Sequence, residues 1–399
     1  MNTAQTTIHA QLQALLSEGP SGAKERERTA FDDQAGPFTN SLVLFGAGGI
    51  GRKTLAGLRK LGIEPLAFAD NNPKLWEQPL QGVPVLPPQE ACARYGKTAA
   101  FVVTIWCGEG WDRMRDRIRF LRDLGCERVL TFGPLYWKYP EIFLPHYAAA
   151  PAHEVHEQAE AVLQASELWA DAPSRQEYLS QIRWRLFFDF DGLANPVEHT
   201  IYFPPDLCSL VADEVFVDCG AYDGDTLVSF LAQPKPGFKR IVAFEPDPGS
   251  FARLSQKVAE LPAKDSIAIH QLATGAENGA VWFTGDGTPA ASVGTGAMRV
   301  DCVKLDDALD DEAPTYIKMD IEGAELDAIE GARQIISRHS PVLTVCSYHK
   351  QDHVWKIPRL IHSINPEYRF FLRPHVADVW DLVCYAIPPR RLIRAADAG

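Results

Sequence analysis

Three phrases in the second half of the chain place carboxylate residues, with glycine in the first and the third, directly after apolar, strand-like runs. They are VFVDCGAYDGDT (215–226), VAFEPDP (242–248) and YIKMDIEGAE (316–325). Because the carboxyl ends of parallel strands meet at one edge of a sheet, the loops that follow them converge on a common ligand. The order and spacing of the phrases therefore predict a nucleoside-binding site at that edge.

The first phrase has the residues that a nucleoside bearing an amino acid would need. Gly220 and Gly224 allow the backbone to turn sharply and approach a ligand closely. Asp218 ends the strand, where a carboxylate can accept hydrogen bonds from a ligand amino group. Thr226 lies near the start of the next helix, whose positive end favours a ligand carboxylate. The methionine part of S-adenosylmethionine carries both groups.

The second and third phrases add charge at neighbouring strand ends. Glu245 follows the next strand, at the position where an acidic residue of a dinucleotide-binding unit accepts the ribose hydroxyls. Lys318, Asp320 and Glu322 alternate with a period of two, which places them on one side of the strand end. Buried unpaired charges cost several kcal/mol each, so this concentration favours a chemical role. A structural Lys318–Asp320 ion pair is the alternative.

Together with VDCVKLDDAL (300–309) and SYHK (347–350), these phrases resemble the FkbM family of S-adenosylmethionine-dependent methyltransferases over roughly residues 200–387. The resemblance implies a class I methyltransferase sheet and methylation of a hydroxyl on a sugar, glycan or polyketide-like acceptor. It also implies that Glu245 holds the ribose, that Ala273 lies beside the adenine and that Asp320 lies on the sulfonium side. The expected cofactor-binding residues are Asp218, Gly220, Ala221, Tyr222, Gly224, Thr226, Glu245, Pro246, Ala273 and Asp320.

Hydroxyl methylation requires alignment of the acceptor oxygen and removal of its proton. His349 follows the fifth strand and titrates near neutral pH, so we expect it to act as the general base. Lys318 and Glu322 complete the expected catalytic set, with His353 and His375 as weaker candidates for the base. Asp320 with Glu322 could instead hold a divalent metal ion, but the sequence offers no fuller ligand set, and we expect none.

The first half of the chain has a glycine fingerprint of its own. Gly46, Gly48 and Gly51 follow an apolar strand, and Asp70 ends the next strand. This context is typical of dinucleotide binding. The phrases FADNNP and GVPVL also resemble nucleotide-binding domains found beside sugar-modifying enzymes. A nucleotide or nucleotide-sugar module is therefore expected here, with an NAD(P)-dependent oxidoreductase, a non-catalytic nucleotide sensor and a purely structural domain as alternatives.

Strand patterns alternate with helix patterns in both halves, which predicts an α/β protein with two doubly wound Rossmann-like domains. The second is expected to contain seven main strands, with an inserted pair (AVWFTG and MRVDCVKL) before the fourth. The expected ranges are a leader helix and linker at 1–40, a nucleotide-binding domain at 41–148, a helical connector at 149–197 and the methyltransferase domain at 198–399.

The bulk composition narrows the choice of partners. The 399 residues carry a formal net charge of -13, which disfavours nucleic acid and anionic membranes. Eight scattered cysteines without CxxC spacing favour buried thiols over disulfides or metal. The first residues lack the pattern of a secretion signal, so we expect a cytoplasmic protein. Its partner is expected to be a small-molecule or glycan acceptor, and a homo-oligomer is compatible with the composition.

Overall fold

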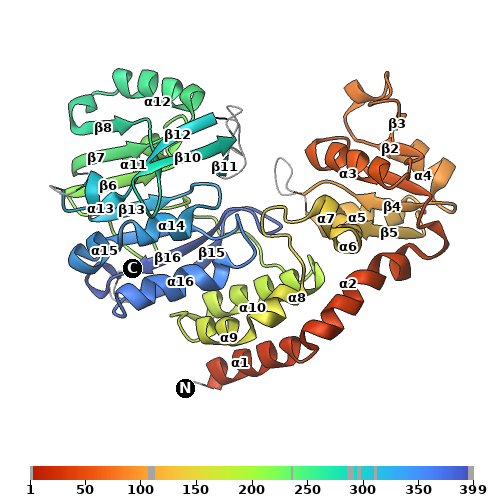
Figure 1. Cartoon of the computed structure of the whole chain (residues 1–399), viewed down its shortest axis with the longest axis horizontal. Helices are drawn as coiled ribbons and strands as arrows, with labels where there is room; N and C mark the ends of the chain where they lie inside the picture. Colours follow the sequence, from red (N-terminus) through yellow and green to blue (C-terminus); the bar gives the residue numbers. More distant parts are fainter. Residues whose placement is uncertain are drawn as a thin grey trace. The chain divides into compact units, whose positions relative to one another are not determined.

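The computed structural model describes residues 3–106, 113–234, 237–284, 292–293, 298–309 and 312–393. The chain forms two compact units, which are described separately (Figure 1). The first unit comprises Met1–Leu163, Glu177–Pro196 and Val376–Trp380, and the second comprises Gln164–Gln176, Val197–His375 and Asp381–Gly399. The chain passes between the units inside the range expected as a connector and again on either side of Val376–Trp380, and the four expected ranges remain predictions.

The first unit is built on a sheet of five parallel strands in the order β3-β2-β1-β4-β5. Its strands are β1 (Leu42–Phe45), β2 (Ala67–Ala69), β3 (Val85–Leu86), β4 (Ala100–Val103) and β5 (Arg128–Thr131). Every residue of β1, β2 and β4 is buried, as expected for a parallel sheet covered on both faces.

Helices cover this sheet, and α2 packs against β5, α6 and α8. The helices are α1 (Thr3–Leu16), α2 (Gly19–Ala35), α3 (Gly49–Lys60), α4 (Pro88–Tyr95), α5 (Met114–Asp123), α6 (Phe132–Lys138), α7 (Pro140–Phe143) and α8 (His153–Glu157). Two further helices, α9 (Ala159–Ser166) and α10 (Ala172–Phe187), each contribute residues to both units.

The second unit contains the expected seven-stranded sheet, in the order β15-β16-β14-β13-β6-β7-β8. Its strands are β6 (Glu214–Cys219), β7 (Phe238–Phe244), β8 (Ile267–His270), β13 (Tyr316–Met319), β14 (Val342–Cys346), β15 (Arg369–Pro374) and β16 (Leu382–Ile387). Neighbouring strands are parallel, except that β16 runs antiparallel to both β14 and β15. The prediction of an α/β protein with two doubly wound sheets is thus confirmed.

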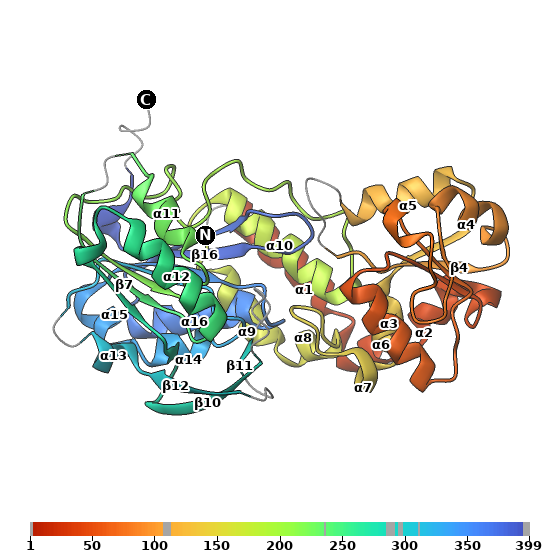
Figure 2. The ribbon, with the colours of Figure 1, turned by 90° about the horizontal axis from the view of Figure 1, so that it is seen from above.

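The central strands consist of uninterrupted buried residues, because helices shield both faces of the sheet. These helices are α11 (Asp225–Leu231), α12 (Pro248–Glu260), α13 (Leu305–Ala308), α14 (Glu325–Glu330), α15 (Arg333–His339) and α16 (His353–Ile364). Helices α14, α15 and α16 lie side by side (Figures 1 and 2). From β6 the chain proceeds outward through β7 and β8, then returns on the other side as β13. This reversal creates a crevice at the carboxyl ends of β6 and β13.

The inserted pair of strands forms part of a second, four-stranded sheet in the order β11-β10-β12-β9. These strands are β9 (Ala273–Thr274), β10 (Gly279–Thr284), β11 (Ser292–Val293) and β12 (Met298–Val303). The antiparallel pair β10 and β12 corresponds to the two phrases singled out in the sequence. Strand β9 pairs in parallel with β12 and brings Ala273 beside the main sheet.

Across the described ranges, no helix combines the length and apolar character that a membrane crossing requires. The seven cysteines within those ranges are buried and form no disulfide. Cys107, the eighth, lies outside the described residues.

Candidate active site

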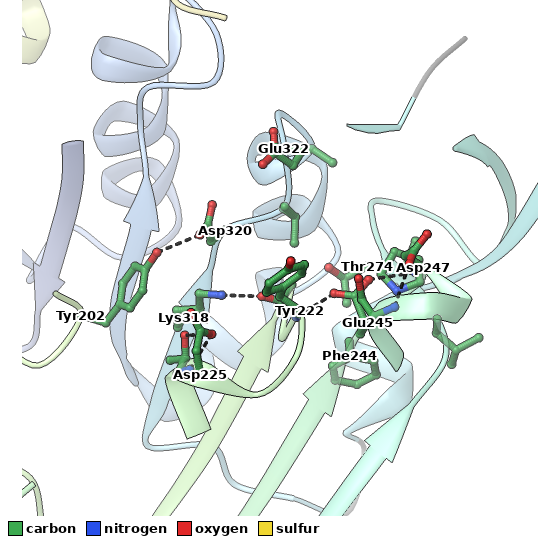
Figure 3. A pocket seen from close by; sticks show the side chains of 18 of the residues that line it. Tyr202, Tyr222, Asp225, Phe244, Glu245, Asp247, Thr274, Lys318, Asp320 and Glu322 are labelled. Carbon is green, nitrogen blue, oxygen red and sulfur yellow. Dashed lines mark hydrogen bonds between the residues drawn. The ribbon is translucent and has the colours of Figure 1, made fainter. Parts of the chain in front are cut away.

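A cavity of about 320 Å³ lies at the carboxyl edge of the second unit, where β6, β7 and β13 end. Figure 3 shows Glu245, Asp247 and Thr274 at one end of it and Tyr202 and Asp320 at the other. The lining residues are Ile201, Tyr202, Gly220, Tyr222, Asp225, Thr226, Phe244, Glu245, Pro246, Asp247, Ser250, Leu272, Ala273, Thr274, Lys318, Asp320, Ile321, Glu322, Ala324, Tyr348 and Asp381.

The loop between β6 and α11 forms the floor of the cavity. Gly220 has φ +80, and a Cβ atom there would lie 1.8 Å from the backbone oxygen of Asp320. Only glycine permits this approach of the β6 loop to the end of β13. The backbone N–H groups of Gly220 and Ala221 both donate to the carbonyl of Phe244 at 3.0 Å, which ties the loop to β7.

Glu245 anchors the same loop from the end of β7. Its Oε2 accepts a hydrogen bond from the Tyr222 N–H, and its Oε1 accepts one from the Asp247 N–H, both at 2.8 Å. Asp247 in turn caps α12 by accepting from the Ser250 N–H at 2.8 Å. Burial raises the pKa of Glu245 to about 7. A buried carboxylate therefore lies at the strand end where ribose hydroxyls are expected.

Lys318 forms its ion pair with Asp218, not with Asp320 as the sequence alternative supposed. Its Nζ lies 3.0 Å from Asp218 Oδ1 and donates to the carbonyl of Gly220 at 2.6 Å. Burial by itself would lower the pKa of Lys318, but the attraction of Asp218 and Asp320 holds that pKa above its usual value. This buried pair secures the β6 loop and leaves the lysine charge balanced.

The far end of the cavity is acidic and aromatic. The Tyr202 hydroxyl donates to Asp320 Oδ2 at 2.8 Å. Asp320 Oδ1 lies 3.4 Å from His349 Nε2, and Glu322 Oε2 lies 3.7 Å from the same nitrogen. The turn that carries Glu322 has φ +54 at that residue, an uncommon conformation for a non-glycine side chain. Tyr348 closes this end, with its ring 4.2 Å from that of His349.

His349 lies behind the cavity wall. Its Nδ1 lies 2.7 Å from Glu325 Oε1, and its side chain is almost fully buried. Burial by itself would lower the pKa of His349, but the Coulombic attraction and hydrogen bond of Glu325, with Asp320 and Glu322, raise that pKa to about 9. In the ligand-free protein the imidazole is therefore protonated at neutral pH.

Besides Glu245, two lining carboxyl groups at the far end of the cavity have raised pKa values. Burial raises the pKa of Glu322 to about 8, with the opposing attraction of His349 outweighed by burial and the neighbouring acids. Burial and then Asp320 raise the pKa of Asp381 to about 6. Acids in such an environment are held away from water and close to one another, so this end of the cavity favours groups that are neutral or positively charged.

One set of potential metal ligands occurs here among the described residues. Asp320, Glu325 and His349 each bring one ligand atom to within 4.8 Å of the others. Glu325 and His349 are already joined by their own ion pair, which accounts for the proximity without an ion. The expectation of no metal remains a prediction.

The structure brings most of the sequence-predicted residues to the cavity. Those that line it are Gly220, Tyr222, Thr226, Glu245, Pro246, Ala273, Lys318, Asp320 and Glu322. Asp218, Ala221 and Gly224 lie behind the surface, where they support the loop. His353 is buried beside Glu325, with Nδ1 3.1 Å from Oε2, and His375 bonds to the Tyr385 hydroxyl at 2.7 Å. Neither lines the cavity.

Sequence reasoning missed several lining residues. Asp225 and Asp247 sit inside the quoted phrases, so their positions after two strand ends were a usable signal. Tyr202 precedes the first strand of the sheet, and Asp381 precedes the last. No local pattern marks either residue, because each reaches the cavity only through the folding of distant segments.

The glycine fingerprint of the first unit has a parallel arrangement. The Ala47 N–H donates to Asp70 Oδ2 at 2.7 Å, and the Asn72 N–H donates to Oδ1 at 2.8 Å. A Cβ atom on Gly51 would lie 2.0 Å from the Gly46 carbonyl oxygen, so α3 packs tightly under the loop. Gly48 faces open space and precedes α3. Asp70 thus clamps its loop as Glu245 clamps the loop of the second unit.

Comparison with known proteins agrees with this architecture. Residues 218–378 match the family model described as the methyltransferase FkbM domain. The crystal structure of Methyltransferase FkbM from Methylobacillus flagellatus KT aligns with a TM-score of 0.75 at 23% identity, covering 96% of this chain and 99% of that chain. A search of curated proteins returned no match.

Two fibrillarin structures align over part of the chain. The pre-rRNA processing protein from Methanococcus jannaschii gives a TM-score of 0.28 at 12% identity, covering 45% of this chain and 70% of that chain. The fibrillarin from Aeropyrum pernix, in complex with natively bound S-adenosyl-L-methionine, gives a TM-score of 0.27 at 12% identity, covering 45% of this chain and 69% of that chain.

A doubly wound seven-stranded sheet with its cavity at the reversal of strand order defines a class I methyltransferase fold. The family match is more specific than the fold. Residues 218–378 match the methyltransferase FkbM domain, so the family prediction is confirmed for that part of the chain, and the protein is an S-adenosylmethionine-dependent methyltransferase.

Proposed function

We propose that the protein methylates a hydroxyl oxygen on a sugar, glycan or polyketide-like acceptor. The observation that carries this proposal is the difference between the two ends of the cavity. At one end the Glu245 carboxylate holds the β6 loop. At the other end Asp320 and Glu322 line the cavity, and His349 lies behind them. When bound, S-adenosylmethionine supplies a methyl group activated by its sulfonium.

The residues of the cavity suit that donor. Glu245 would hold the ribose, and Phe244, Leu272 and Ala273 offer apolar surface to the adenine. The acidic side chains at the other end complement the positive sulfonium and amino groups. Within the described lining, Lys318 is the basic residue, and its charge is already balanced by Asp218.

The acceptor end favours a neutral, hydroxyl-rich molecule. Asp320, Glu322 and Asp381 line it together with the rings of Tyr202 and Tyr348. Carboxylates accept hydrogen bonds from hydroxyl groups, and aromatic rings provide apolar faces against which a sugar can stack. The same acids would repel a phosphate or carboxylate next to the reacting oxygen.

Proton removal is assigned to the Asp320 carboxylate with His349 behind it, because the His349 imidazolium has no free nitrogen lone pair of its own at neutral pH. An attacking hydroxyl becomes strongly acidic as its new bond to carbon forms, so its proton needs only a nearby acceptor. His349 Nε2 lies 3.4 Å from Asp320 and 3.7 Å from Glu322, which both face the cavity. Lys318 does not act on the proton directly. It holds the Gly220 carbonyl and thereby the loop between β6 and α11.

Calorimetry with S-adenosylmethionine tests donor binding. Glu245→Ala removes the ribose ligand and the loop clamp together, and loss of such charge-assisted bonds should weaken binding by about 10- to 100-fold. Asp70→Ala is the matched control, because it removes the equivalent clamp from the first unit and should leave donor affinity unchanged. Equal affinities for the Glu245→Ala variant and the unmodified protein would refute the assigned site.

A screen of glycan, nucleotide-sugar and polyketide acceptors with labelled donor tests the hydroxyl chemistry. Transfer to nitrogen or sulfur alone would reject hydroxyl methylation. A chelator added to the same reactions distinguishes the metal alternative: unchanged rates support proton removal without a metal ion, whereas loss of transfer that is restored by a divalent ion favours a metal at Asp320 and Glu322.

For the first unit we propose a nucleotide or nucleotide-sugar site, because Asp70 clamps its glycine loop as Glu245 clamps the donor loop. An NAD(P)-dependent oxidoreductase is the alternative. Gly48 faces open space, so Gly48→Val should fold and obstruct the loop. If the unmodified protein quenches nicotinamide fluorescence and Gly48→Val abolishes the quenching, the oxidoreductase is favoured. If the protein binds a nucleotide sugar but does not quench nicotinamide fluorescence, the nucleotide-sugar site is favoured.

A further inference from the structure

Glu325 is a fully buried carboxylate that none of the proposed roles explains. It is the first residue of α14, with 0% of its surface exposed. Ionised groups in such positions are costly unless they are paired and hydrogen-bonded. Within the described structure the hydrogen bonds of Glu325 converge on Oε1, while Oε2 has the nearby His353 imidazole but no hydrogen bond.

Its contacts join two neighbouring strand ends. Oε1 lies 2.7 Å from His349 Nδ1 and accepts the backbone N–H groups of Ile321 at 3.0 Å and Gly323 at 3.3 Å. Oε2 lies 3.1 Å from His353 Nδ1, at the start of α16. One carboxylate therefore holds the turn after β13 and the imidazole after β14.

This arrangement controls which atoms face the cavity. A carboxylate against Nδ1 requires the hydrogen to be on that nitrogen, which leaves Nε2 directed toward Asp320 and Glu322. The two backbone bonds to Ile321 and Gly323 bracket Glu322 and hold its left-handed turn. Orientation of a working histidine by a buried acid is a recurrent device in catalytic sites.

We propose that Glu325 is the positioning residue for proton removal, holding His349 with Nε2 toward the acceptor end of the cavity and fixing the Glu322 turn beside it. This inference rests on the proposed hydroxyl methylation. In that reaction the acceptor oxygen gains the methyl group, the sulfonium of the donor becomes a neutral thioether, and the proton of the oxygen passes to the Asp320 carboxylate, which the His349 imidazolium faces through Nε2.

Several other charged groups surround His349 and could influence its tautomer and its protonation. Glu325 faces it from α14, Asp320 and Glu322 face it from the turn after β13, and Asp381 acts on it electrostatically from the start of β16. Lys350 packs its side chain against Gly323 in the same turn. Glu325 is the nearest of the acids, so it should dominate both the tautomer and the protonation of the imidazole.

The first measurement is nitrogen NMR of His349 in the full-length, unmodified protein across pH 6 to 10. It needs no donor, acceptor or variant. We expect the neutral form to carry its hydrogen on Nδ1 and the imidazolium to persist well above the ordinary histidine range. A neutral form with hydrogen on Nε2, or titration at the ordinary value near 6.5, would overturn the proposal.

The second measurement compares Glu325→Gln with Glu330→Gln, a matched change at an exposed position of the same helix that pairs with Arg333. We expect Glu325→Gln to lower kcat by about 100-fold. It should also move the His349 titration to lower pH by more than one unit and change the donor affinity less than threefold. Glu330→Gln should change none of these. An unaltered titration in folded Glu325→Gln protein contradicts the proposal.

Two further variants separate positioning from simple support of the fold. Glu325→Asp keeps the charge and should recover part of the titration shift, whereas His353→Gln removes the other partner and should leave the His349 tautomer unchanged. If no hydroxyl acceptor is methylated, the proposed function fails while the NMR result still decides the role of Glu325. If methylation proceeds with an unperturbed His349, only the positioning role fails.

Discussion

At the scale of single residues, the site is organised by charges that are buried in pairs. Lys318 and Asp218 form one such pair under the donor loop, and His349 and Glu325 form another behind the acceptor end. A buried pair stabilises a protein little compared with apolar packing, but removing one partner leaves the other uncompensated. The pairs therefore fix geometry more than they add stability.

Replacing Lys318 by methionine should destabilise the protein by about 3–5 kcal/mol, because Asp218 would remain buried without its partner. Urea denaturation measures the change. The double variant Lys318→Met with Asp218→Asn should recover more than half of the loss. Lys257→Met, which breaks the partly exposed pair with Asp223, should cost less than about 1 kcal/mol. A small effect of Lys318→Met alone would show that the buried charge is solvated.

The raised pKa values predict how stability depends on pH. The pKa of His349 is about 9 in the folded protein against an ordinary 6.5, so its contribution is complete below pH 6.5 and is lost as the pH rises through 9. The pKa of Glu322 is about 8 against 4.5, so stability falls with rising pH between those values as well. We expect His349→Gln to reduce the pH dependence of stability between pH 6.5 and 9, and Glu322→Gln to reduce it between pH 4.5 and 8.

Unfolding free energies measured at pH 5, 6.5, 8 and 9 separate the two windows. His339→Gln provides the comparison for the histidine, because it changes the same residue type in the last turn of α15. Stability that rises between pH 6.5 and 9 in the unmodified protein would contradict the assigned direction.

At the scale of elements, the donor site depends on close approach of the β6 loop to the end of β13. The parallel register pairs Asp218 with Lys318 and Cys219 with Met319, so the next residues, Gly220 and Asp320, leave the sheet together. Only a residue without a side chain fits between the two backbones. The conformation of this loop is therefore set by the strand pairing as much as by its own sequence.

Gly220→Ala and Gly224→Ala should differ although both glycines have positive φ. At Gly220 a Cβ atom would meet the Asp320 carbonyl oxygen at 1.8 Å, whereas at Gly224 the nearest atom is the flexible Leu254 Cδ1 at 3.0 Å. We expect a loss of about 3 kcal/mol or more and a displaced donor loop for the first, and about 1 kcal/mol for the second. Thermal denaturation and donor calorimetry check both, and equal losses would indicate that φ strain alone matters.

The elements also show what the sequence could and could not predict. Apolar runs followed by carboxylate residues, with glycine after β6 and β13, identified the ends of β6, β7 and β13, because each run and its turn are contiguous in the chain. The alternative of a Lys318–Asp320 ion pair named a different partner from the Asp218 that the structure shows, since pairing across strands depends on register, which no single strand reveals. Tyr202 and Asp381 were missed for the same reason: they reach the cavity through contacts between segments far apart in sequence.

At the scale of the whole molecule, two doubly wound sheets follow from the alternation of strand and helix patterns, but the path of the chain between them does not. Residues 164–176 lie in the range expected as a connector, yet they belong to the second unit. Amphipathic helix patterns show that a segment buries one face. They do not show which sheet it covers.

The segment 164–176 covers β15, an edge strand of the seven-stranded sheet. The Ala170 N–H donates to the Phe370 carbonyl at 2.8 Å, and the Ser174 Oγ accepts the Leu372 N–H at 2.9 Å. Asp171 caps α10 through the Ser174 N–H at 2.9 Å and pairs with the buried Arg373. An uncovered edge strand is a template for aggregation, and a buried arginine that keeps only the more distant Asp206, at 3.8 Å, is costly.

A fragment beginning at residue 164 should therefore fold and bind the donor better than one beginning at 198. The shorter fragment exposes the β15 edge and leaves Arg373 without Asp171, so we expect it to aggregate or to unfold at a urea concentration lower by at least about 1 M, given a loss of about 3 kcal/mol. In the longer fragment, Asp171→Ala should reproduce part of that loss of stability. Asp171→Asn keeps the helix cap but removes the charge, so it should reproduce a smaller part. Light scattering, urea denaturation and donor calorimetry on the four proteins check the expectation. Equal stability of the two fragments would mean that residues 198–399 contain every contact the second unit requires, and the edge would then have to be protected by the remaining strands alone.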